Sequence, residues 1–210
     1  MTCGAAASLN IIFKAIIESE NDEIIVNTPY FPEYKVFIEG QGAKFVPVKC
    51  NKDLLLDIEA IENKISINTK AVLINSPNNP SGVIYPKENI GELVKLLNRK
   101  QKEYNHPIFL ISDEPYRELV FIDEHPTFLP NVYDNTLVAY SWSKSLSLPG
   151  ERIGYILVPD KVKEYENVFA AISGAARVLG YVCAPSMFQK VIKHCFTSLT
   201  PHIKSKKFPP

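Results

Sequence analysis

KAVLINSPNNPSG, residues 70–82, joins a run of apolar, strand-forming residues to a polar loop that is rich in asparagine and proline. The same design recurs twice, because PIFLIS (107–112) leads into an acidic turn and TLVAYS (136–141) leads into a segment that contains Lys144. Near-continuous apolar strands of this kind are typical of parallel sheets whose two faces are both covered by helices. The three stretches therefore predict an α/β fold.

Helix-like and strand-like segments alternate along the rest of the chain. Apolar residues spaced three and four apart predict helices, and short β-branched runs predict further strands. The predicted helices span 9–17, 32–42, 56–65 and 87–102, and the further strands span 23–27, 43–48 and 152–159. This alternation predicts a mainly parallel sheet with helices on both faces.

The chain has 210 residues, of which 46% are hydrophobic, so it is long enough for one sizeable domain with a proper core. No linker, repeat or low-complexity segment divides it, and we expect a single domain over residues 1–196. From about Thr197 the sequence turns polar, basic and proline-rich. Residues 197–210 are therefore expected to form a disordered tail.

The charge pattern gives no indication of a nucleic-acid or membrane partner, because 23 basic and 23 acidic residues are interspersed along the chain. No apolar run is long enough to span a bilayer, and no secretory signal precedes the first apolar segment. The cysteines form no CxxC pair and the histidines lack metal-ligand spacing, so we expect no metal site and a reducing, cytoplasmic setting. The cysteines are Cys3, Cys50, Cys183 and Cys195.

Polar residues follow the ends of three predicted strands, namely Asn79, Asp113 and Lys144. Each has an ordinary structural interpretation: a turn asparagine, a capping aspartate and a solvated lysine. Ligands of open α/β sheets, however, bind at the carboxyl ends of the strands. The three residues are therefore expected to share one site.

Together with their neighbours, these residues offer a candidate for each group that an amine-bound pyridoxal phosphate requires. Lys144 is a candidate nucleophilic amine for the aldehyde, and Asp113 is a candidate partner that would keep the ring nitrogen protonated. Tyr116 and Asn79 could each reach the phenolic oxygen. Phe31 could stack on the ring, although a single aromatic residue after a strand is more often part of the core.

Candidate residues for binding the phosphate group lie near the start of the chain and on both sides of Lys144. GAAAS opens the first predicted helix, so the backbone amides near Gly4, Ala5 and Ala6 would face an anion at the positive end of a helix dipole. Ser141 and Arg152 flank Lys144, and Arg152 would add a permanent charge. Ser143 is either a further phosphate donor or a cap at the strand end.

The order of these motifs resembles the class I and II pyridoxal-phosphate aminotransferases of the aspartate aminotransferase fold, over residues 2 to about 195. SxSK followed by PGxRxG is similar to the family's lysine motif. NNPSG, DEPY, PYF and GAAAS are similar to its other cofactor motifs. The resemblance implies that Lys144 forms a Schiff base with the cofactor and that its phosphate is bound by Ser141, Arg152 and the helix start at Gly4–Ala6. It also implies that Asn79 and Tyr116 contact the phenolic oxygen, that Asp113 contacts the ring nitrogen, and that Phe31 stacks on the ring.

The resemblance also implies the fold and the activity. The expected architecture is the large domain of this fold, without the amino-terminal arm and carboxy-terminal small domain of the longer family members. The expected reaction moves an amino group between an amino acid and a 2-oxo acid, with Lys144 acting first as the amine and then as the base. Intact members of the family are expected to be homodimers.

Two alternatives stay open at this point. Carbon–sulfur lyases share the same fold and cofactor site, and the residues quoted above do not separate them from aminotransferases. Alternatively, the chain could be a catalytically impaired remnant that acts only by pairing with a full-length relative. Formation of pyruvate and ammonia without a 2-oxo acid acceptor would indicate the lyase, and heterodimers with a full-length relative would indicate the remnant.

Overall fold

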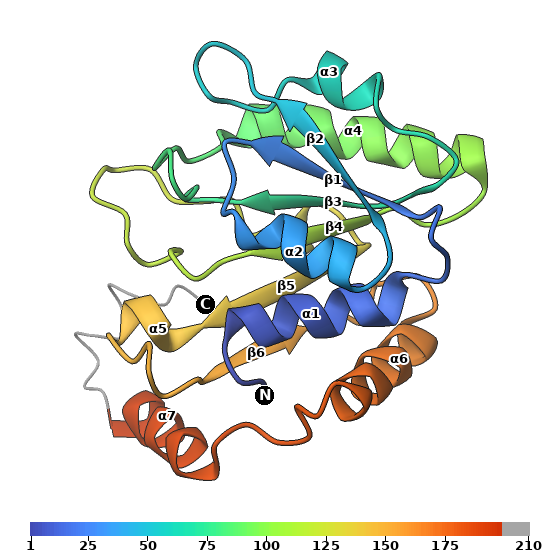
Figure 1. The fold of residues 1–210 in the computed structure, drawn as a ribbon. Coiled ribbons are helices and arrows are strands. Elements are labelled where there is room, and N and C mark those ends of the chain that lie inside the picture. Colours follow the sequence, from blue (N-terminus) through green and yellow to red (C-terminus); the bar gives the residue numbers. More distant parts are fainter. Residues whose placement is uncertain (199–210) are drawn as a thin grey trace.

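The computed structural model describes residues 1–198, which form a six-stranded sheet covered by helices (Figure 1). The strand order is β2-β1-β3-β4-β5-β6, in which β1 to β5 are parallel and β6 is antiparallel to β5. This arrangement confirms the predicted α/β fold with a mainly parallel sheet. The strands are β1 (Glu23–Thr28), β2 (Lys44–Lys49), β3 (Thr69–Asn75), β4 (Phe109–Asp113), β5 (Thr136–Ser141) and β6 (Gly154–Leu157).

Helices cover both faces of the sheet, as Figure 1 shows. One face packs against α1 (Ala5–Ile16), α2 (Glu33–Gly40) and α6 (Tyr165–Val178). The other face packs against α3 (Ile58–Glu62) and α4 (Lys87–Tyr104). The remaining helical segments are α5 (Trp142–Ser145), the 3₁₀ turn η1 (Leu129–Asn131) and α7 (Ser186–Ser198).

Two cores form because successive side chains of a strand point to opposite faces. In β3, Leu73 belongs to the core under α1 and α2, whereas Val72 and Ile74 belong to the core under α4. All three side chains are at most 3% exposed. Burial on both faces explains why residues 71–74 (AVLI) form an unbroken apolar run without polar alternation.

Three helices, the short α5 and the longer α6 and α7, are not among the elements that the sequence predicts. The apolar positions of α7 rest on a third, smaller core, in which Ile192 packs near Trp142 and Tyr140. Thr197, at the start of the predicted tail, belongs to α7, which extends to Ser198. The rest of that tail, residues 199–210, lies outside the described residues.

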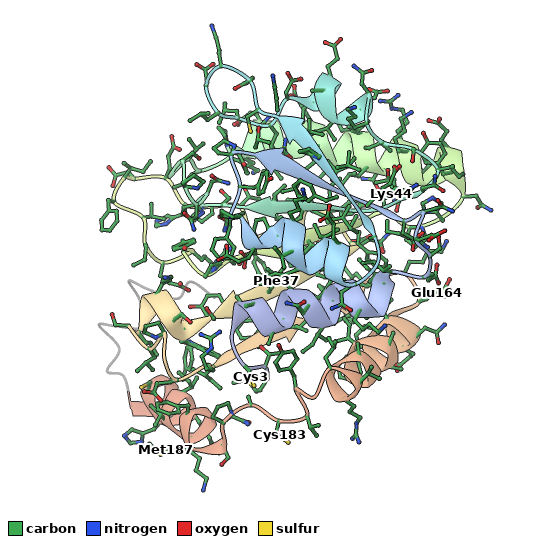
Figure 2. All side chains as sticks on the ribbon, in the orientation of Figure 1. Cys3, Phe37, Lys44, Glu164, Cys183 and Met187 are labelled. Carbon is green, nitrogen blue, oxygen red and sulfur yellow. The ribbon has the colours of Figure 1, made fainter. Side chains whose placement is uncertain are left out.

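Lys44 at the start of β2 and Glu164 before α6, both labelled in Figure 2, are exposed. Over residues 1–198, no helix is long and apolar enough to cross a membrane. Within the same range, no group of three or more His, Cys, Asp or Glu side chains is placed to hold a metal ion.

Candidate active site

A cavity of about 190 Å³ lies at the edge of the sheet where β3, β4 and β5 end. The last residues of these strands, Asn75, Asp113 and Ser141, all line it. The first turn of α1 and the start of α2 close its other sides. The full lining consists of Ala5, Ala6, Leu9, Phe31, Tyr34, Asn75, Asn79, Asp113, Pro115, Tyr116, Ser141, Ser143, Lys144, Pro149 and Arg152.

The structure therefore brings the residues that the sequence singles out around one cavity. Gly4 is the one of these residues that does not line the cavity; it lies behind the lining, against the guanidinium of Arg152. Fold topology explains the convergence, because parallel strands deliver their carboxyl ends to a single edge of the sheet.

The first turn of α1 and the side chain of Arg152 form a cradle at one side of the cavity. Gly4 precedes the helix with φ of 85°, and a Cβ built there would lie 2.7 Å from Nη2 of Arg152. The guanidinium is held by the carbonyl oxygens of Pro149, 2.7 Å from Nη1, and of Cys3, 3.3 Å from Nη2. Arg152 itself adopts φ of 52°, a strained conformation for a side chain of this size.

Gly154 lets the start of α1 approach the sheet this closely. A Cβ at Gly154 would lie 2.3 Å from the carbonyl oxygen of Tyr140 and 3.0 Å from the Cα of Gly4. Thr2 pairs with Gly154 through two backbone hydrogen bonds of 2.8 and 3.0 Å. The absence of a side chain at Gly154 thus sets the position of the helix start relative to β5 and β6.

Lys144 lies in the short helix α5, directly after β5. Its Nζ is 5.8 Å from the centre of the Tyr116 ring. The hydroxyl of Tyr116 accepts a hydrogen bond of 3.2 Å from Nδ2 of Asn79. The three side chains that follow β3, β4 and β5 therefore converge on one wall of the cavity.

Asp113, the last residue of β4, is 5% exposed. Its Oδ2 accepts a hydrogen bond of 2.5 Å from the hydroxyl of Tyr34, whereas Oδ1 is buried without a partner. Burial raises the pKa of the Asp113 carboxyl to about 7; the Tyr34 hydrogen bond lowers it, and the neighbouring Glu114 raises it further. A buried carboxylate oxygen without a partner requires a proton or a cationic donor from outside the chain.

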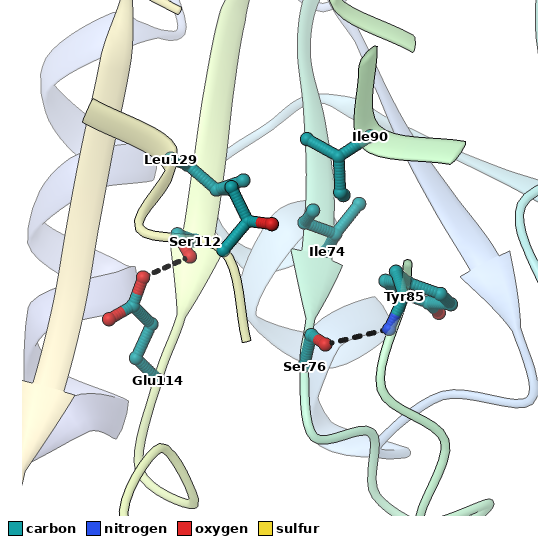
Figure 3. A pocket seen from close by; sticks show the side chains of 8 residues that line it. Ile74, Ser76, Tyr85, Ile90, Ser112, Glu114 and Leu129 are labelled. Atoms are coloured by element: carbon teal, nitrogen blue, oxygen red, sulfur yellow. Dashed lines mark hydrogen bonds between the residues drawn. The ribbon is translucent and has the colours of Figure 1, made fainter. Parts of the chain in front are cut away.

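The carboxyl of Glu114, next to Asp113 in the chain, is satisfied from within the protein. Arg117 donates to its Oε2 over 2.9 Å, and Ser112 donates to its Oε1 over 2.8 Å. Glu114 and Ser112 line a second cavity of about 10 Å³ between β3 and β4, shown in Figure 3, which has the volume of about one water molecule. This small cavity has no room for a cofactor.

Tyr34 and Asn75 are site residues that sequence reasoning missed. Asn75 donates from Nδ2 to the Asp113 carbonyl oxygen over 2.8 Å and accepts at Oδ1 from the Asn79 N–H over 2.7 Å. Asn75 ends an apolar strand, so its position was a usable signal. Tyr34 gives a weaker signal, since it lies in the first turn of α2, three residues after Phe31, which precedes the helix.

The lining fits pyridoxal phosphate in its chemistry. The unpartnered Oδ1 of Asp113 matches a protonated pyridine nitrogen, and the cradle at Gly4 and Arg152 matches a phosphate group. Phe31 supplies an aromatic wall, and Lys144 an amine.

Comparison with known proteins agrees with this chemistry. The family model described as "Aminotransferase class I and II" matches residues 1–197. An aspartate aminotransferase from Pyrococcus horikoshii is 33% identical over 178 residues, which cover 83% of this chain and 44% of that protein. An aspartate/prephenate aminotransferase from Thermus thermophilus is 34% identical over 177 residues, covering 82% of this chain and 43% of that protein.

Solved structures show the same similarity. An aminotransferase from Eubacterium rectale is 54% identical with a TM-score of 0.91, over 92% of this chain and 49% of that one. A variant of Thermus thermophilus aspartate aminotransferase is 30% identical with a TM-score of 0.80, over 94% and 51% of the two chains. The present chain thus spans less than half the length of the curated relatives that it matches. By sequence, fold and family model, the chain belongs to the class I and II aminotransferases.

Proposed function

We propose that this chain binds pyridoxal phosphate and uses it to move an amino group between an amino acid and a 2-oxo acid. The observation that carries the proposal is the pairing, in one cavity, of a buried carboxylate with a free oxygen (Asp113) and a lysine (Lys144). The family membership agrees with this activity. Following the resemblance, we propose a homodimer as the working assembly.

The first turn of α1 and Arg152 would bind the phosphate group. The amides at the start of a helix have no partners within the helix, and the helix dipole favours an anion there. Ala5 and Ala6 have small side chains that let an anion approach the backbone. Ser141, at the end of β5, would donate its hydroxyl from the side of the sheet.

Asp113, Tyr116 and Asn79 would hold the ring. Asp113 would accept a hydrogen bond at Oδ1 from the protonated ring nitrogen, and this partner would remove the cost of burying Oδ1 without one. Tyr116 and Asn79 are already joined by a hydrogen bond, so both can donate to one phenolic oxygen with little rearrangement. Phe31 would stack against one face of the ring and so fix the orientation of its plane.

When bound, pyridoxal phosphate supplies an aldehyde carbon for the substrate amine and a ring that accepts electrons from the α-carbon. Lys144 would hold the aldehyde carbon between turnovers. Once displaced by the substrate amine, Lys144 would take the α-proton at Nζ and return it at the former aldehyde carbon of the cofactor. The 5.8 Å between Nζ and the Tyr116 ring keeps this amine close to the ring-holding residues.

Borohydride trapping tests the proposal directly, because it fixes an amine–aldehyde linkage as a stable adduct. The protein is loaded with pyridoxal phosphate, reduced, digested and mapped by mass spectrometry. We expect the adduct on Lys144, and we expect Lys144→Arg to lose it. Label spread over surface lysines such as Lys35, with none on Lys144, would contradict the proposal.

A single-turnover assay tests the reaction itself. The loaded protein, in excess over an amino acid, should release the corresponding 2-oxo acid and retain the nitrogen on the cofactor. Release of pyruvate and ammonia in the same assay would instead indicate the elimination chemistry of a carbon–sulfur lyase.

A further inference from the structure

Tyr34 occupies an unusual position for a core tyrosine. Its side chain is 2% exposed and belongs to the core between α2 and the sheet, yet its hydroxyl reaches the cavity edge and meets Oδ2 of Asp113 at 2.5 Å. Phe31 packs edge-on against its ring, with 5.6 Å between the ring centres and 75° between the planes. The ring is thus fixed by packing, and the hydroxyl is fixed with it.

This contact sets the orientation of the Asp113 carboxylate. Within residues 1–198, Tyr34 is the side chain that donates to this carboxylate, and it binds only one of the two oxygens. The hydrogen bond to Oδ2 restricts rotation of the carboxylate about its Cβ–Cγ bond. The other oxygen, Oδ1, is therefore held in one place without a partner.

Tyr34 is well suited to remain a donor. Burial raises the pKa of its phenol well above the ordinary value, and the neighbouring Asp113 raises it further. The phenol therefore keeps its proton, and when the pair carries a negative charge, that charge resides on Asp113. A charge-assisted hydrogen bond of this kind is short and strongly directional.

We propose that Tyr34 is a positioning residue for the cofactor ring: it anchors Asp113 through Oδ2 so that Oδ1 points its charge at the protonated ring nitrogen. This inference rests on the proposed function and deepens it. Tyr34 acts through Asp113 and does not touch the ring nitrogen. A tyrosine that only fills the core would leave the pairing of Asp113 with the nitrogen unchanged when its hydroxyl is removed.

An analogue of pyridoxal phosphate with a C–H group in place of the ring nitrogen separates these roles. Both compounds carry the same phosphate and aldehyde, and their intrinsic differences are the same for every variant. A change in the ratio of their dissociation constants between variants therefore reports the interaction with the nitrogen. The ratio is measured by equilibrium dialysis for the wild-type chain, Tyr34→Phe, Asp113→Asn and the double variant. Tyr133→Phe is the matched control, since it loses a buried 2.6 Å hydrogen bond to the Ile108 carbonyl, away from the cavity.

We expect the wild-type chain to prefer pyridoxal phosphate, and Tyr34→Phe to reduce this preference roughly tenfold, as for loss of a hydrogen bond to a charged group. Tyr133→Phe should keep the wild-type preference. In the Asp113→Asn background, adding Tyr34→Phe should change the ratio no further, because the two residues act as a unit.

Three outcomes would overturn the inference, and they differ in what they leave standing. Equal weakening of both compounds in Tyr34→Phe would make Tyr34 a packing residue and leave the proposed function intact. Urea titrations at 25 °C show whether each variant is folded before urea is added. If Tyr34→Phe is already unfolded there while Tyr133→Phe is folded, Tyr34 has a role in stability only. No preference in the wild-type chain would remove the pairing of Asp113 with the nitrogen, and with it that part of the proposed function.

Discussion

The side-chain amide of Asn75 ties the end of β3 to Asp113, donating from Nδ2 to the Asp113 carbonyl oxygen over 2.8 Å. The same amide accepts from the backbone N–H of Asn79 through Oδ1 over 2.7 Å. One side chain, 3% exposed, thus fixes the backbone on both sides of it. The two residues that it holds, Asp113 and Asn79, carry the side chains proposed to contact the ring nitrogen and the phenolic oxygen.

Asn75→Ala should therefore lower both stability and cofactor affinity. The substitution leaves the Asp113 carbonyl and the Asn79 N–H without partners, and each such buried group costs about 1–3 kcal/mol. Urea unfolding measures the first effect, and titration with pyridoxal phosphate measures the second. Asn89→Ala is the matched control, because Asn89 also bridges two backbone groups, the N–H and the carbonyl of Leu56, far from the cavity.

The control should lose a comparable amount of stability but bind the cofactor like the wild-type chain. If both variants bind it equally well, Asn75 is a structural bridge without influence on the site.

Gly4→Ala should weaken binding of the phosphate group. A Cβ at this position would lie 2.7 Å from Nη2 of Arg152, and φ of 85° is strained for alanine. Arg152 must then move away from the helix start, and we expect affinity for pyridoxal phosphate to fall roughly tenfold, or about 1.4 kcal/mol. Isothermal titration calorimetry with pyridoxal phosphate and with inorganic phosphate measures the change.

Gly174→Ala is the matched control for Gly4→Ala. Gly174 lies within α6, and a Cβ there would meet nothing within 4 Å. Replacing an exposed helix glycine by alanine should stabilise the chain by about 1 kcal/mol and leave binding unchanged. Unaltered phosphate affinity in Gly4→Ala would show that the cradle does not bind the anion.

Sequence reasoning predicted the strand-end residues because their positions depend only on where apolar strands stop. Asp113 and Lys144 each follow a strand without polar alternation, and a parallel sheet brings such ends together. The same logic applied to Asn75, but an asparagine four residues before Asn79 was indistinguishable from ordinary turn chemistry. Its role depends on two backbone contacts that only the folded chain creates.

Tyr34 and the helices α6 and α7 show a different limit. Tyr34 occupies a helix position that faces the core, and no spacing rule tells where a core tyrosine places its hydroxyl. In α6, Val168, Ile172 and Ala175 pack against the core at helical spacing, so this helix carries an apolar stripe that sequence reasoning did not use. The contacts that stabilise α7 come from Trp142 and its neighbours, which are distant in sequence.

The stability of the cofactor-free chain should depend on pH through Asp113. Burial raises the pKa of this carboxyl to about 7, above its value of about 3.9 in an unfolded chain, so the native state holds the proton more tightly. Stability is then lost as the pH rises from about 4 to about 7, by an amount on the order of 4 kcal/mol. Asp113→Asn lacks this group and should lose less stability over the same range.

Urea unfolding of both proteins between pH 4 and pH 8 gives the difference directly. Tyr34, Glu114 and Tyr116 also interact with Asp113 electrostatically, and all three are present in both proteins. The advantage of Asp113→Asn should be absent near pH 4 and largest above pH 7. A difference that does not vary with pH would mean that Asp113 titrates near its ordinary value.

The chain of residues 1–210 should bind pyridoxal phosphate and yet transaminate slowly. Arg152 is the one arginine among the residues that line the cavity in the described part of the chain, and it is proposed to bind the phosphate. Arg99 pairs with Glu62 and Arg117 with Glu114, so neither is placed to hold a substrate carboxylate. Without a bidentate clamp the α-carbon is poorly oriented, and such orientation can contribute about 7–11 kcal/mol to catalysis.

Steady-state assays of the loaded protein with aspartate, alanine and aromatic amino acids test this prediction. We expect turnover far below the range of roughly 1–10³ per second found in ordinary enzymes. Borohydride trapping on Lys144, measured in the same preparation, shows that the cofactor is in place and that slow turnover is not caused by its loss. Turnover within the ordinary range would mean that this chain grips the substrate carboxylate with a group other than an arginine of the cavity wall.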